Sequence, residues 1–404
     1  MLIGIVGKPS CGKSTFFKAA TLVDVAIAPH PFTTIKPNRG MGHVKLECVD
    51  KEFNTKCIPR TGYHLDSTIG NKTGWRFVPV ELMDVAGLIP GSHAGRGLGN
   101  QFLNDLNQGD ALIHIVDASG TTDAEGRATD GHDPTEDVRF LEEEIDLWFK
   151  GILDRHWEKI LRLLEQKKDI EELIATALTA FKITPEIARS AIDKLGFDKT
   201  KTKSWTQEQL RAFTTELRKA TKPILIAANK ADMPASAKNI EKMKREFPHL
   251  LIIPCAADAE IALREAAKKG MIKYAPGDSD FELSNPSALT PQQASALEFI
   301  RSNVLKKWGS TGVQQVMNAA VFDLLKYVAI WPGGVNKLSD REGRILPDVF
   351  LLPPGSTALD FAFKIHTDIG KGFLFAIDVR TKRRIGKEAL LKSRDVIEII
   401  SAAK

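Results

Sequence analysis

A phosphate-binding pattern lies near the start of the chain. It has the form G-x-x-x-x-G-K-[ST] and consists of Gly7, Lys8, Pro9, Ser10, Cys11, Gly12, Lys13 and Ser14, with Thr15 directly after it. An apolar run precedes the pattern, and a helix is expected to follow it. Backbone N–H groups of such a loop converge on phosphate oxygens, and the helix dipole favours negative charge. The pattern therefore predicts a site for a nucleoside triphosphate.

Two side chains of this loop have separate roles in the predicted chemistry. Lys13 is expected to contact β- and γ-phosphate oxygens as a positioned charge, and the Ser14 hydroxyl to ligate Mg²⁺. A second motif, D-x-x-G at residues 84–87, closes another apolar run. In P-loop proteins such an aspartate faces Mg²⁺, and such a glycine N–H meets the γ-phosphate. Asp84 is therefore a candidate metal residue, and Gly87 a candidate γ-phosphate contact.

A third motif indicates which base is bound. It consists of Asn229, Lys230, Ala231 and Asp232. The Asn229 amide can engage O6 and N7 of guanine, the Asp232 carboxylate can accept from N1–H and the 2-amino group, and the Lys230 stem is expected to pack along the base. A backbone N–H that contacts guanine O6 is expected from the later stretch Cys255, Ala256 and Ala257.

The same motif disfavours adenine. Adenine has an acceptor at N1 and a donor at C6, so Asp232 would face an acceptor and Asn229 would be mispaired. Each buried polar group left unpaired costs about 1–3 kcal/mol. Two such losses correspond to roughly 10²–10⁴-fold discrimination. The sequence therefore predicts GTP and GDP as ligands, together with Mg²⁺.

The motifs follow the ends of apolar runs that read as buried strands. These runs are 2–6, 78–85, 111–116, 224–228 and 250–254, and the third ends at Asp117. Open parallel sheets bind ligands beyond the carboxyl ends of their strands. We therefore expect an α/β fold, in which a P-loop GTPase sheet carries helices on both faces.

Bulk composition is that of an ordinary globular protein. The 404 residues are 43% apolar and 26% charged, with a formal net charge of +5. No apolar stretch approaches the roughly 20 residues that span a bilayer, so no membrane association is expected. The four cysteines form no C-x-x-C pair, which favours a reduced chain. We expect a cytoplasmic monomer.

The pattern of apolar residues divides the chain into four parts. We expect the first part of the GTPase domain at 1–134, a helical insertion at 135–218, the second part of the GTPase domain at 219–326, and a small C-terminal domain at 327–404. Within the insertion, Thr184 and Gly196 bound one helix, and a capping box at 206–209 starts another. The insertion either shields the sheet or forms a helical arm for a partner.

The C-terminal part has the pattern of a small α+β domain. Strands are expected at 346–352, 373–379 and 396–400, with a Pro-Pro-Gly turn at 353–355 and a short helix capped by Ser356 or Thr357. This order suggests a β-grasp-like domain. Residues 341–404 hold 12 Lys and Arg against 8 Asp and Glu, and include a basic cluster at 380–384. The cluster is either a footprint for a phosphate backbone or a solvated turn.

The ordered motifs resemble those of the Obg-related GTPases. The resemblance rests on 7–14, Pro31-Phe32-Thr33-Thr34 with Pro37-Asn38, 84–87 and 229–232, and on a glycine-rich stretch at 95–99 that is similar to the second switch of that group. The helical insertion and the segments 352–357 and 365–368 resemble the YchF branch, and the intact guanine motif is closest to its archaeal-type members. The C-terminal segment is similar to a TGS domain, which threonyl-tRNA synthetases and stringent-response synthetases share.

The resemblance implies a switch that acts in translation. It makes Thr34 the switch threonine that meets Mg²⁺ and the γ-phosphate, with Thr33 as the neighbouring alternative. Lys13, Thr34 and Gly87 are then the candidate catalytic residues. Ribosomes or structured RNA are the implied partners. A nucleotide-sensing adaptor with incidental hydrolysis, and an ATPase of the same family, remain alternatives.

Catalysis is expected to be slow. Leu88 follows the D-x-x-G motif where Ras-like enzymes have the glutamine that orients the attacking water, and leucine can neither donate nor accept a hydrogen bond. Some relatives use K⁺, held in part by an asparagine of the phosphate loop. Ser10 stands at that position and has a shorter reach, which disfavours K⁺ activation without removing it. His93 is expected to be solvated rather than catalytic.

Overall fold

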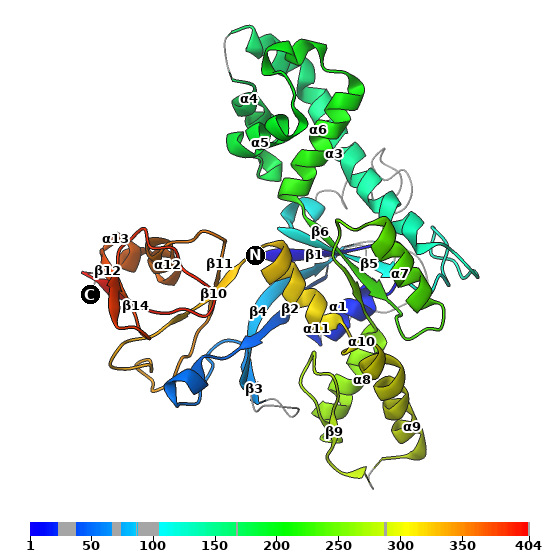
Figure 1. Ribbon diagram of the computed structural model, residues 1–404, viewed down its shortest axis with the longest axis vertical. Helices are drawn as coiled ribbons and strands as arrows, with labels where there is room; N and C mark the ends of the chain where they lie inside the picture. Colours follow the sequence, from blue (N-terminus) through cyan, green and yellow to red (C-terminus); the bar gives the residue numbers. More distant parts are fainter. Residues whose placement is uncertain are drawn as a thin grey trace. The chain divides into compact units, whose positions relative to one another are not determined.

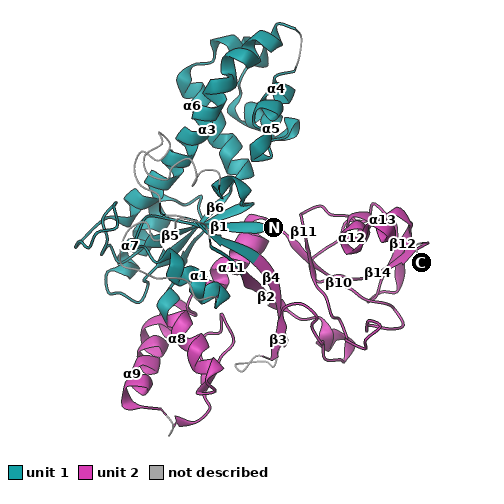
Figure 2. Ribbon diagram, turned by 180° about the vertical axis from the view of Figure 1, so that it is seen from behind, with its two compact units in different colours: residues 1–40, 81–258 teal, residues 41–80, 259–404 magenta. Residues whose placement is uncertain are grey.

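The computed structural model describes residues 1–22, 38–66, 74–85, 87, 105–166, 169–286 and 289–402. The chain forms two compact units (Figure 2). Unit 1 comprises Met1–Gly40 and Glu81–Asp258, and unit 2 comprises Met41–Val80 and Ala259–Lys404.

The first sheet has seven strands in the described residues, in the order β2-β4-β1-β5-β6-β7 with β3 paired to β4 (Figure 1). These strands are β1 (Leu2–Val6), β2 (Asn38–Glu47), β3 (Tyr63–Asp66), β4 (Gly74–Asp84), β5 (Ala111–Asp117), β6 (Ile224–Asn229) and β7 (Ile252–Pro254). Strand β1 pairs in parallel with β4 and β5, and β6 pairs in parallel with β5 and β7. The two longest strands, β2 and β4, run from one unit into the other.

Burial explains why the central strands form. Every residue of β1, β5 and β6 is buried. Continuous apolar strands of this kind are typical of parallel sheets covered on both faces. The register places Asp84 beside Ile5, and Asp117 beside Asn229. The predicted strand ends therefore lie at one edge of the sheet.

Unit 1 contains most of the long helices. They are α1 (Lys13–Thr21), α3 (Pro134–Leu164), α4 (Ile170–Ala177), α5 (Pro185–Leu195), α6 (Gln207–Thr221) and α7 (Ser236–Glu246), with short 3₁₀ turns at Thr179–Phe181 and Lys199–Ser204. Helix α8 (Ala257–Lys268) begins in unit 1. The predicted caps are confirmed, since Thr184 caps α5, Gly196 ends it, and Thr206 and Gln209 form a capping box on α6.

Helices α3 to α6 pack on one another through aromatic side chains. Phe181 contacts Trp148 and Phe149 of α3, with ring centroids 4.9 and 4.5 Å apart. Trp205 stacks on Trp157 and contacts Phe213 of α6. Aromatic pairs of this kind contribute beyond the area that they bury, which explains how short helices remain ordered beside the 31-residue α3.

The C-terminal part of unit 2 forms a second sheet in the order β11-β10-β14-β12-β13. Its elements are β10 (Val328–Pro332), β11 (Phe350–Leu352), α12 (Ala358–Ile365), α13 (Thr367–Lys371), β12 (Phe373–Asp378), β13 (Arg383–Ile385) and β14 (Val396–Ser401). Phe361 of α12 is fully buried against Ile330 and Leu352. Thr357, rather than Ser356, caps α12, through a box with Asp360.

One predicted strand of this domain is wrong at its start. A strand was expected from Leu346, but β11 begins at Phe350. Leu346 has a φ of 45°, in the left-handed region that an extended strand does not use. The chain turns there before it enters the sheet.

The remaining elements of unit 2 are short. They are η1 (Asp50–Phe53), β8 (Ile272–Lys273), β9 (Glu282–Leu283), α9 (Pro291–Ile300), η6 (Arg301–Leu305), α10 (Lys306–Trp308), α11 (Val313–Asn318) and η7 (Ala319–Leu324). Among the helices that the structure describes, none is both long and apolar enough to cross a membrane.

Candidate nucleotide-binding site

The phosphate loop joins β1 to α1, and two of its glycines are required by close contacts. Gly7 has a φ of 148°, and a Cβ there would lie 2.5 Å from the Ile115 carbonyl oxygen. Gly12 has a φ of 97°, and a Cβ there would lie 2.2 Å from the Asn229 amide nitrogen. Both positions exclude any other residue. The loop therefore closes tightly over the ends of β5 and β6.

The two lysines of the loop have different partners. Lys13 Nζ donates to the Lys8 carbonyl at 2.6 Å, so its amine lies inside the curve of the loop. Lys8 Nζ instead donates to the Thr122 carbonyl at 2.7 Å and pairs with Asp137 at 2.8 Å. The Lys8 amine is thus bound to other residues of the protein rather than directed at a phosphate. Any contact of Lys8 with phosphate falls to its backbone N–H.

Ser14 and Asp84, the predicted magnesium residues, are hydrogen-bonded to each other. Ser14 Oγ donates to Asp84 Oδ2 at 2.9 Å. Asp84 is fully buried, and its Oδ1 has no hydrogen-bond partner among the described residues. Burial raises the pKa of Asp84, while Lys13 and the Ser14 hydroxyl oppose that rise. A buried carboxylate oxygen without a donor fits a cation, and Mg²⁺ prefers such oxygen ligands.

Gly87 lies against the phosphate loop. A Cβ on Gly87 would come within 3.2 Å of the Pro9 backbone nitrogen and 3.3 Å of Lys13 Nζ. The glycine of the second motif therefore adjoins the lysine that is predicted to hold the γ-phosphate. The other switch residues of the sequence analysis lie outside the described residues. They are Pro31, Phe32, Thr33, Thr34, Pro37, Leu88, His93 and the stretch 95–99.

Asn229 ties the guanine motif to the phosphate loop. Its Nδ2 donates to the Cys11 carbonyl at 3.1 Å, and its Oδ1 accepts from the Ala257 N–H at 3.2 Å. Only 2% of Asn229 is exposed. The Cys255 N–H donates to the Ala228 carbonyl, and the Ala231 N–H to the Cys255 carbonyl. Three stretches far apart in the sequence are thus joined by one amide.

Asp117 positions Lys230, a role that the sequence analysis missed. Asp117 Oδ2 pairs with Lys230 Nζ at 2.8 Å, and its carboxylate also accepts from Ser119 and Thr122. Burial alone would raise the pKa of Asp117, but these bonds, above all the one from Lys230, hold it below its usual value. The position of Asp117 at the end of an apolar run was the available signal.

Asp232 follows on the same loop and has a second carboxylate nearby. Partial burial raises the pKa of Asp258, and the nearby charge of Asp232 adds to that rise. Lys230 opposes that effect. The predicted base-reading aspartate is therefore in a negatively charged environment, suited to donors such as the N1–H and 2-amino groups of guanine.

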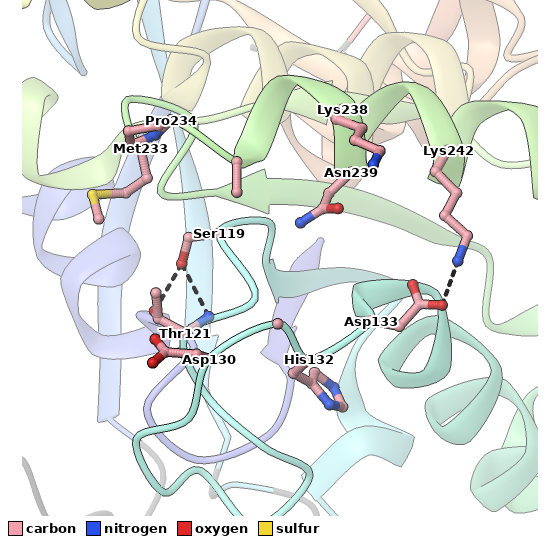
Figure 3. A pocket seen from close by; sticks show the side chains of 12 residues that line it. Ser119, Thr121, Asp130, His132, Asp133, Met233, Pro234, Lys238, Asn239 and Lys242 are labelled. Carbon is pink, nitrogen blue, oxygen red and sulfur yellow. Dashed lines mark hydrogen bonds and ion pairs between the residues drawn. The ribbon is translucent and has the colours of Figure 1, made fainter.

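A cavity of about 550 Å³ lies beside the guanine motif, between the loop after β5 and helix α7 (Figure 3). Ser119 and Thr121 are on one side, while Lys238 and Asn239 are on the other. Lys242 is paired with Asp133 at the rim. None of the residues predicted to bind the nucleotide lines this cavity, so it is separate from the predicted site.

Three family models match this chain. The model described as a 50S ribosome-binding GTPase matches residues 2–146. The Obg-like GTPase YGR210-like, G4 motif-containing domain matches residues 227–334, and the TGS domain matches residues 342–401. The fold and the site are therefore those of a P-loop GTPase with a C-terminal TGS domain.

Individual proteins extend the likeness to the whole chain. A GTP-binding protein of Methanocaldococcus jannaschii is 46% identical over 404 residues, which cover 100% of each chain. The crystal structure of a GTP-binding protein from Pyrococcus horikoshii matches with a TM-score of 0.77, 40% identity and 100% coverage of each chain. The ribosome-binding ATPase YchF of Bacillus subtilis is 28% identical over 286 residues, covering 66% of this chain and 69% of that protein. The chain belongs to the same family of GTP-binding proteins as the Methanocaldococcus jannaschii relative, and it is similar to the Obg-like and YchF proteins.

Proposed function

We propose that this GTPase binds GTP and GDP with Mg²⁺, hydrolyses GTP slowly, and acts as a switch on ribosomes or structured RNA. The observation that carries the proposal is the Asn229 side chain. It bonds at once to the phosphate loop at Cys11 and to the loop of Ala257. A purine triphosphate with its metal would engage these same loops together.

The preference for guanine is expected to come from Asp232 and the neighbouring loops. The N–H groups of Cys255 and Ala257 already have protein partners. We therefore expect the Ala256 N–H to donate to guanine O6. Adenine would leave buried groups unpaired, each at a cost of about 1–3 kcal/mol. We therefore expect a preference for GTP, although the YchF protein of Bacillus subtilis is named an ATPase.

Magnesium would be held by Ser14 and Asp84, with Thr34 added when the γ-phosphate is present. The Asp84 oxygen that lacks a donor supports the first two assignments. When bound, Mg²⁺ supplies positive charge to the β- and γ-phosphate oxygens. Lys13 adds a second positive charge inside the loop. Loss of the γ-phosphate would remove the contacts of Thr34 and Gly87 and release both switch segments.

Slow turnover follows from Leu88, which cannot orient a water molecule.

We also propose that the chain is divided into four parts, at residues 1–134, 135–218, 219–326 and 327–404. A matching family model is described as a ribosome-binding GTPase, and the Bacillus subtilis relative is named as ribosome-binding. Both descriptions support a ribosomal partner for this chain.

The basic cluster of the TGS domain is a candidate contact for RNA. It spans the turn after β12 and the first residues of β13, and Lys382 and Arg383 in it are exposed. Arg380 is already paired with Glu52 at 2.6 Å, and Arg384 lies over the Phe375 ring. Only part of the cluster is therefore free to meet phosphates.

Single-turnover hydrolysis with and without ribosomes tests the switch. The switch predicts faster GTP hydrolysis with ribosomes, and a ribosome affinity that differs between the GTP and GDP forms. Binding should weaken as salt rises if Lys382 and Arg383 contact phosphates. An unchanged hydrolysis rate together with equal affinity of the two forms would instead support an adaptor with incidental hydrolysis.

A further inference from the structure

Four side chains in unit 2 form a cluster that is separate from the nucleotide-binding residues. Cys48, Asp50, Cys57 and His64 each place one ligand atom within 4.8 Å of the others. We propose that these four residues bind a structural Zn²⁺ ion. The proposal does not depend on which nucleotide or partner the GTPase uses.

The distances fit a four-coordinate ion. Zn–S bonds of about 2.3 Å and Zn–N or Zn–O bonds of about 2.0–2.2 Å place tetrahedral ligand atoms about 3.3–3.8 Å apart. The two Sγ atoms of Cys48 and Cys57 are 3.5 Å apart, and His64 Nδ1 is 3.6 Å from Asp50 Oδ2. Cys57 Sγ and His64 Nδ1 approach to 2.8 Å. Two of these separations match the tetrahedral range, and Cys57 Sγ and His64 Nδ1, which are closer, would move apart to admit the ion.

The burial of these side chains argues against a chance grouping of surface residues. Cys48, Asp50 and Cys57 are 3%, 2% and 4% exposed, and the His64 side chain is 5% exposed. Buried ionisable groups are normally paired or bound to a metal. With four protein ligands and little solvent access, the site has no open position for a substrate. Such closed sites are structural rather than catalytic.

The elements that supply the ligands are local. Cys48 follows β2, Asp50 opens η1, and His64 lies on β3, so the ligands come from a stretch of the chain that turns back on itself. Asp50 Oδ2 also accepts from the Cys57 N–H at 3.2 Å, which fixes the carboxylate beside the thiol. The ligand spacing is longer than that of a C-x-x-C motif. That is why the sequence alone did not reveal the site.

The surrounding groups complete the site. His64 Nε2 lies 3.3 Å from Asp66 Oδ1, so the nitrogen that faces away from the cluster has a carboxylate partner. This carboxylate–histidine–metal arrangement orients metal-binding imidazoles in proteins. Arg76 is fully buried, and its Nη1 lies 3.6 Å from Cys57 Sγ. Two thiolates, one carboxylate and Zn²⁺ leave one negative charge, which the guanidinium balances.

The ligand types select the metal. Thiolate and imidazole ligands favour Zn²⁺ over Mg²⁺, Ca²⁺ or K⁺, which prefer all-oxygen sites. A disulfide is the competing chemistry for Cys48 and Cys57. Their Sγ atoms are 3.5 Å apart, far longer than the S–S bond of about 2.05 Å. Both cysteines are free in the structure.

The ion would stabilise the contact between this loop and residues 345–347 of the TGS domain. The Ile58 N–H donates to the Ile345 carbonyl at 2.8 Å, and the Arg60 N–H to the Pro347 carbonyl at 2.9 Å. Arg76 donates to the Pro347 carbonyl at 2.5 Å. Zn²⁺ would therefore fix the loop to which residues 345–347 are bonded. Its removal should lower the thermal stability of the chain.

Metal analysis of the full-length protein, purified without chelators or an affinity tag that binds metals, tests the proposal. We expect close to one Zn²⁺ per chain in the wild type and near none in Cys57→Ser or His64→Ala. His249→Gln, an exposed histidine outside the cluster, should keep the full amount. Asp66→Asn should retain the ion but bind it about 10–100-fold more weakly.

A second measurement does not depend on whether the variants fold. The wild-type protein is stripped with a chelator and titrated with Co²⁺, and the absorption of the complex is recorded. We expect one equivalent to bind, with a sulfur-to-cobalt charge-transfer band and a gain in thermal stability, and Zn²⁺ to displace the Co²⁺. Absence of Zn²⁺ in the purified protein together with no charge-transfer band would overturn the proposal. So would a Cys48–Cys57 disulfide in protein purified under reducing conditions.

Discussion

Lys8 of the phosphate loop forms a buried ion pair with Asp137 in the first turns of α3, at a distance of 2.8 Å. Their side chains are 2% and 5% exposed. His132 Nε2 contacts the other oxygen of Asp137 at 2.9 Å. Burial raises the pKa of Asp137, and Lys8 opposes that rise. The loop that is predicted to hold phosphate is thus joined directly to α3, a helix of 31 residues.

Removing one member of this pair should destabilise the protein strongly. In Asp137→Ala the Lys8 amine keeps its burial but loses its counter-charge, and breaking a buried pair in this way typically costs about 3–5 kcal/mol. Urea denaturation of the two proteins measures the difference. Asp130→Ala, which alters an exposed aspartate of the preceding loop, should change the free energy of unfolding by less than about 0.5 kcal/mol. Equal effects of the two substitutions would show that the pair has no special role.

Asn229→Ala should weaken the binding of GTP and GDP alike. The substitution removes the hydrogen bonds to Cys11 and Ala257 that join the loops, neither of which is expected to depend on the γ-phosphate. A loss of about 1–3 kcal/mol corresponds to roughly 5–150-fold in affinity. Titration with fluorescent nucleotides measures the affinity of each protein for GTP and GDP. Asn239→Ala, an amide on α7 that bonds to Ala118, should leave both affinities unchanged. Loss confined to GTP would contradict the bridging role of Asn229.

Asp84→Asn should remove most of the effect of Mg²⁺ on nucleotide affinity. The amide keeps the shape of the side chain and can still bond to Ser14, but it lacks the charge that a divalent cation requires. Nucleotide titrations with Mg²⁺ and with excess EDTA give, for each protein, the ratio of the nucleotide affinity with Mg²⁺ to the affinity without it. We expect a large ratio for the wild type and a ratio near one for the variant. The same ratio in both proteins would place the metal elsewhere.

His114 should make the protein sensitive to acid. It is 2% exposed on β5, and burial, with added repulsion from Lys13 and Lys8, lowers its pKa to about 3. The unfolded chain binds a proton at this histidine below about pH 6.5, whereas the folded chain stays neutral. Stability attributable to His114 is therefore complete above pH 6.5 and is lost as pH falls towards 3.

The matched variant is His114→Leu. Between pH 6 and pH 4, the wild type should lose about 1.4 kcal/mol of unfolding free energy per pH unit relative to the variant. Denaturant unfolding at several pH values measures this difference. Parallel stability curves for the two proteins would show that the folded chain protonates His114 freely.

The sequence predicted the parts of the fold that depend on local patterns. Buried apolar runs gave β1, β5 and β6, and the capping residues Thr184 and Thr206 gave the starts of two helices. Position at a strand end also brought Asp84 and Asn229 to one edge of the sheet. These features follow from nearest neighbours in the chain and from the rule that parallel strands end together.

Contacts between distant residues could not be predicted in the same way. Lys8 belongs to the phosphate motif, yet its amine bonds to Thr122 and Asp137, more than a hundred residues away. Strand β10 was not predicted, and it forms by pairing with β11 and with β14, which lie later in the chain. The ligands Cys48 and His64 are brought together by folding of the loop between them. Such pairings depend on tertiary packing, which residue type and spacing do not specify.

Base preference is measured by competition between ATP and labelled GTP in the presence of Mg²⁺. We infer that residues 7–14, 84–87, 229–232 and 255–257 together form one site for a guanine nucleotide. We predict that the wild-type protein binds GTP and that ATP displaces it only at roughly 10²–10⁴-fold higher concentration. Equal displacement by ATP, or no binding of GTP at millimolar concentration, would contradict the account.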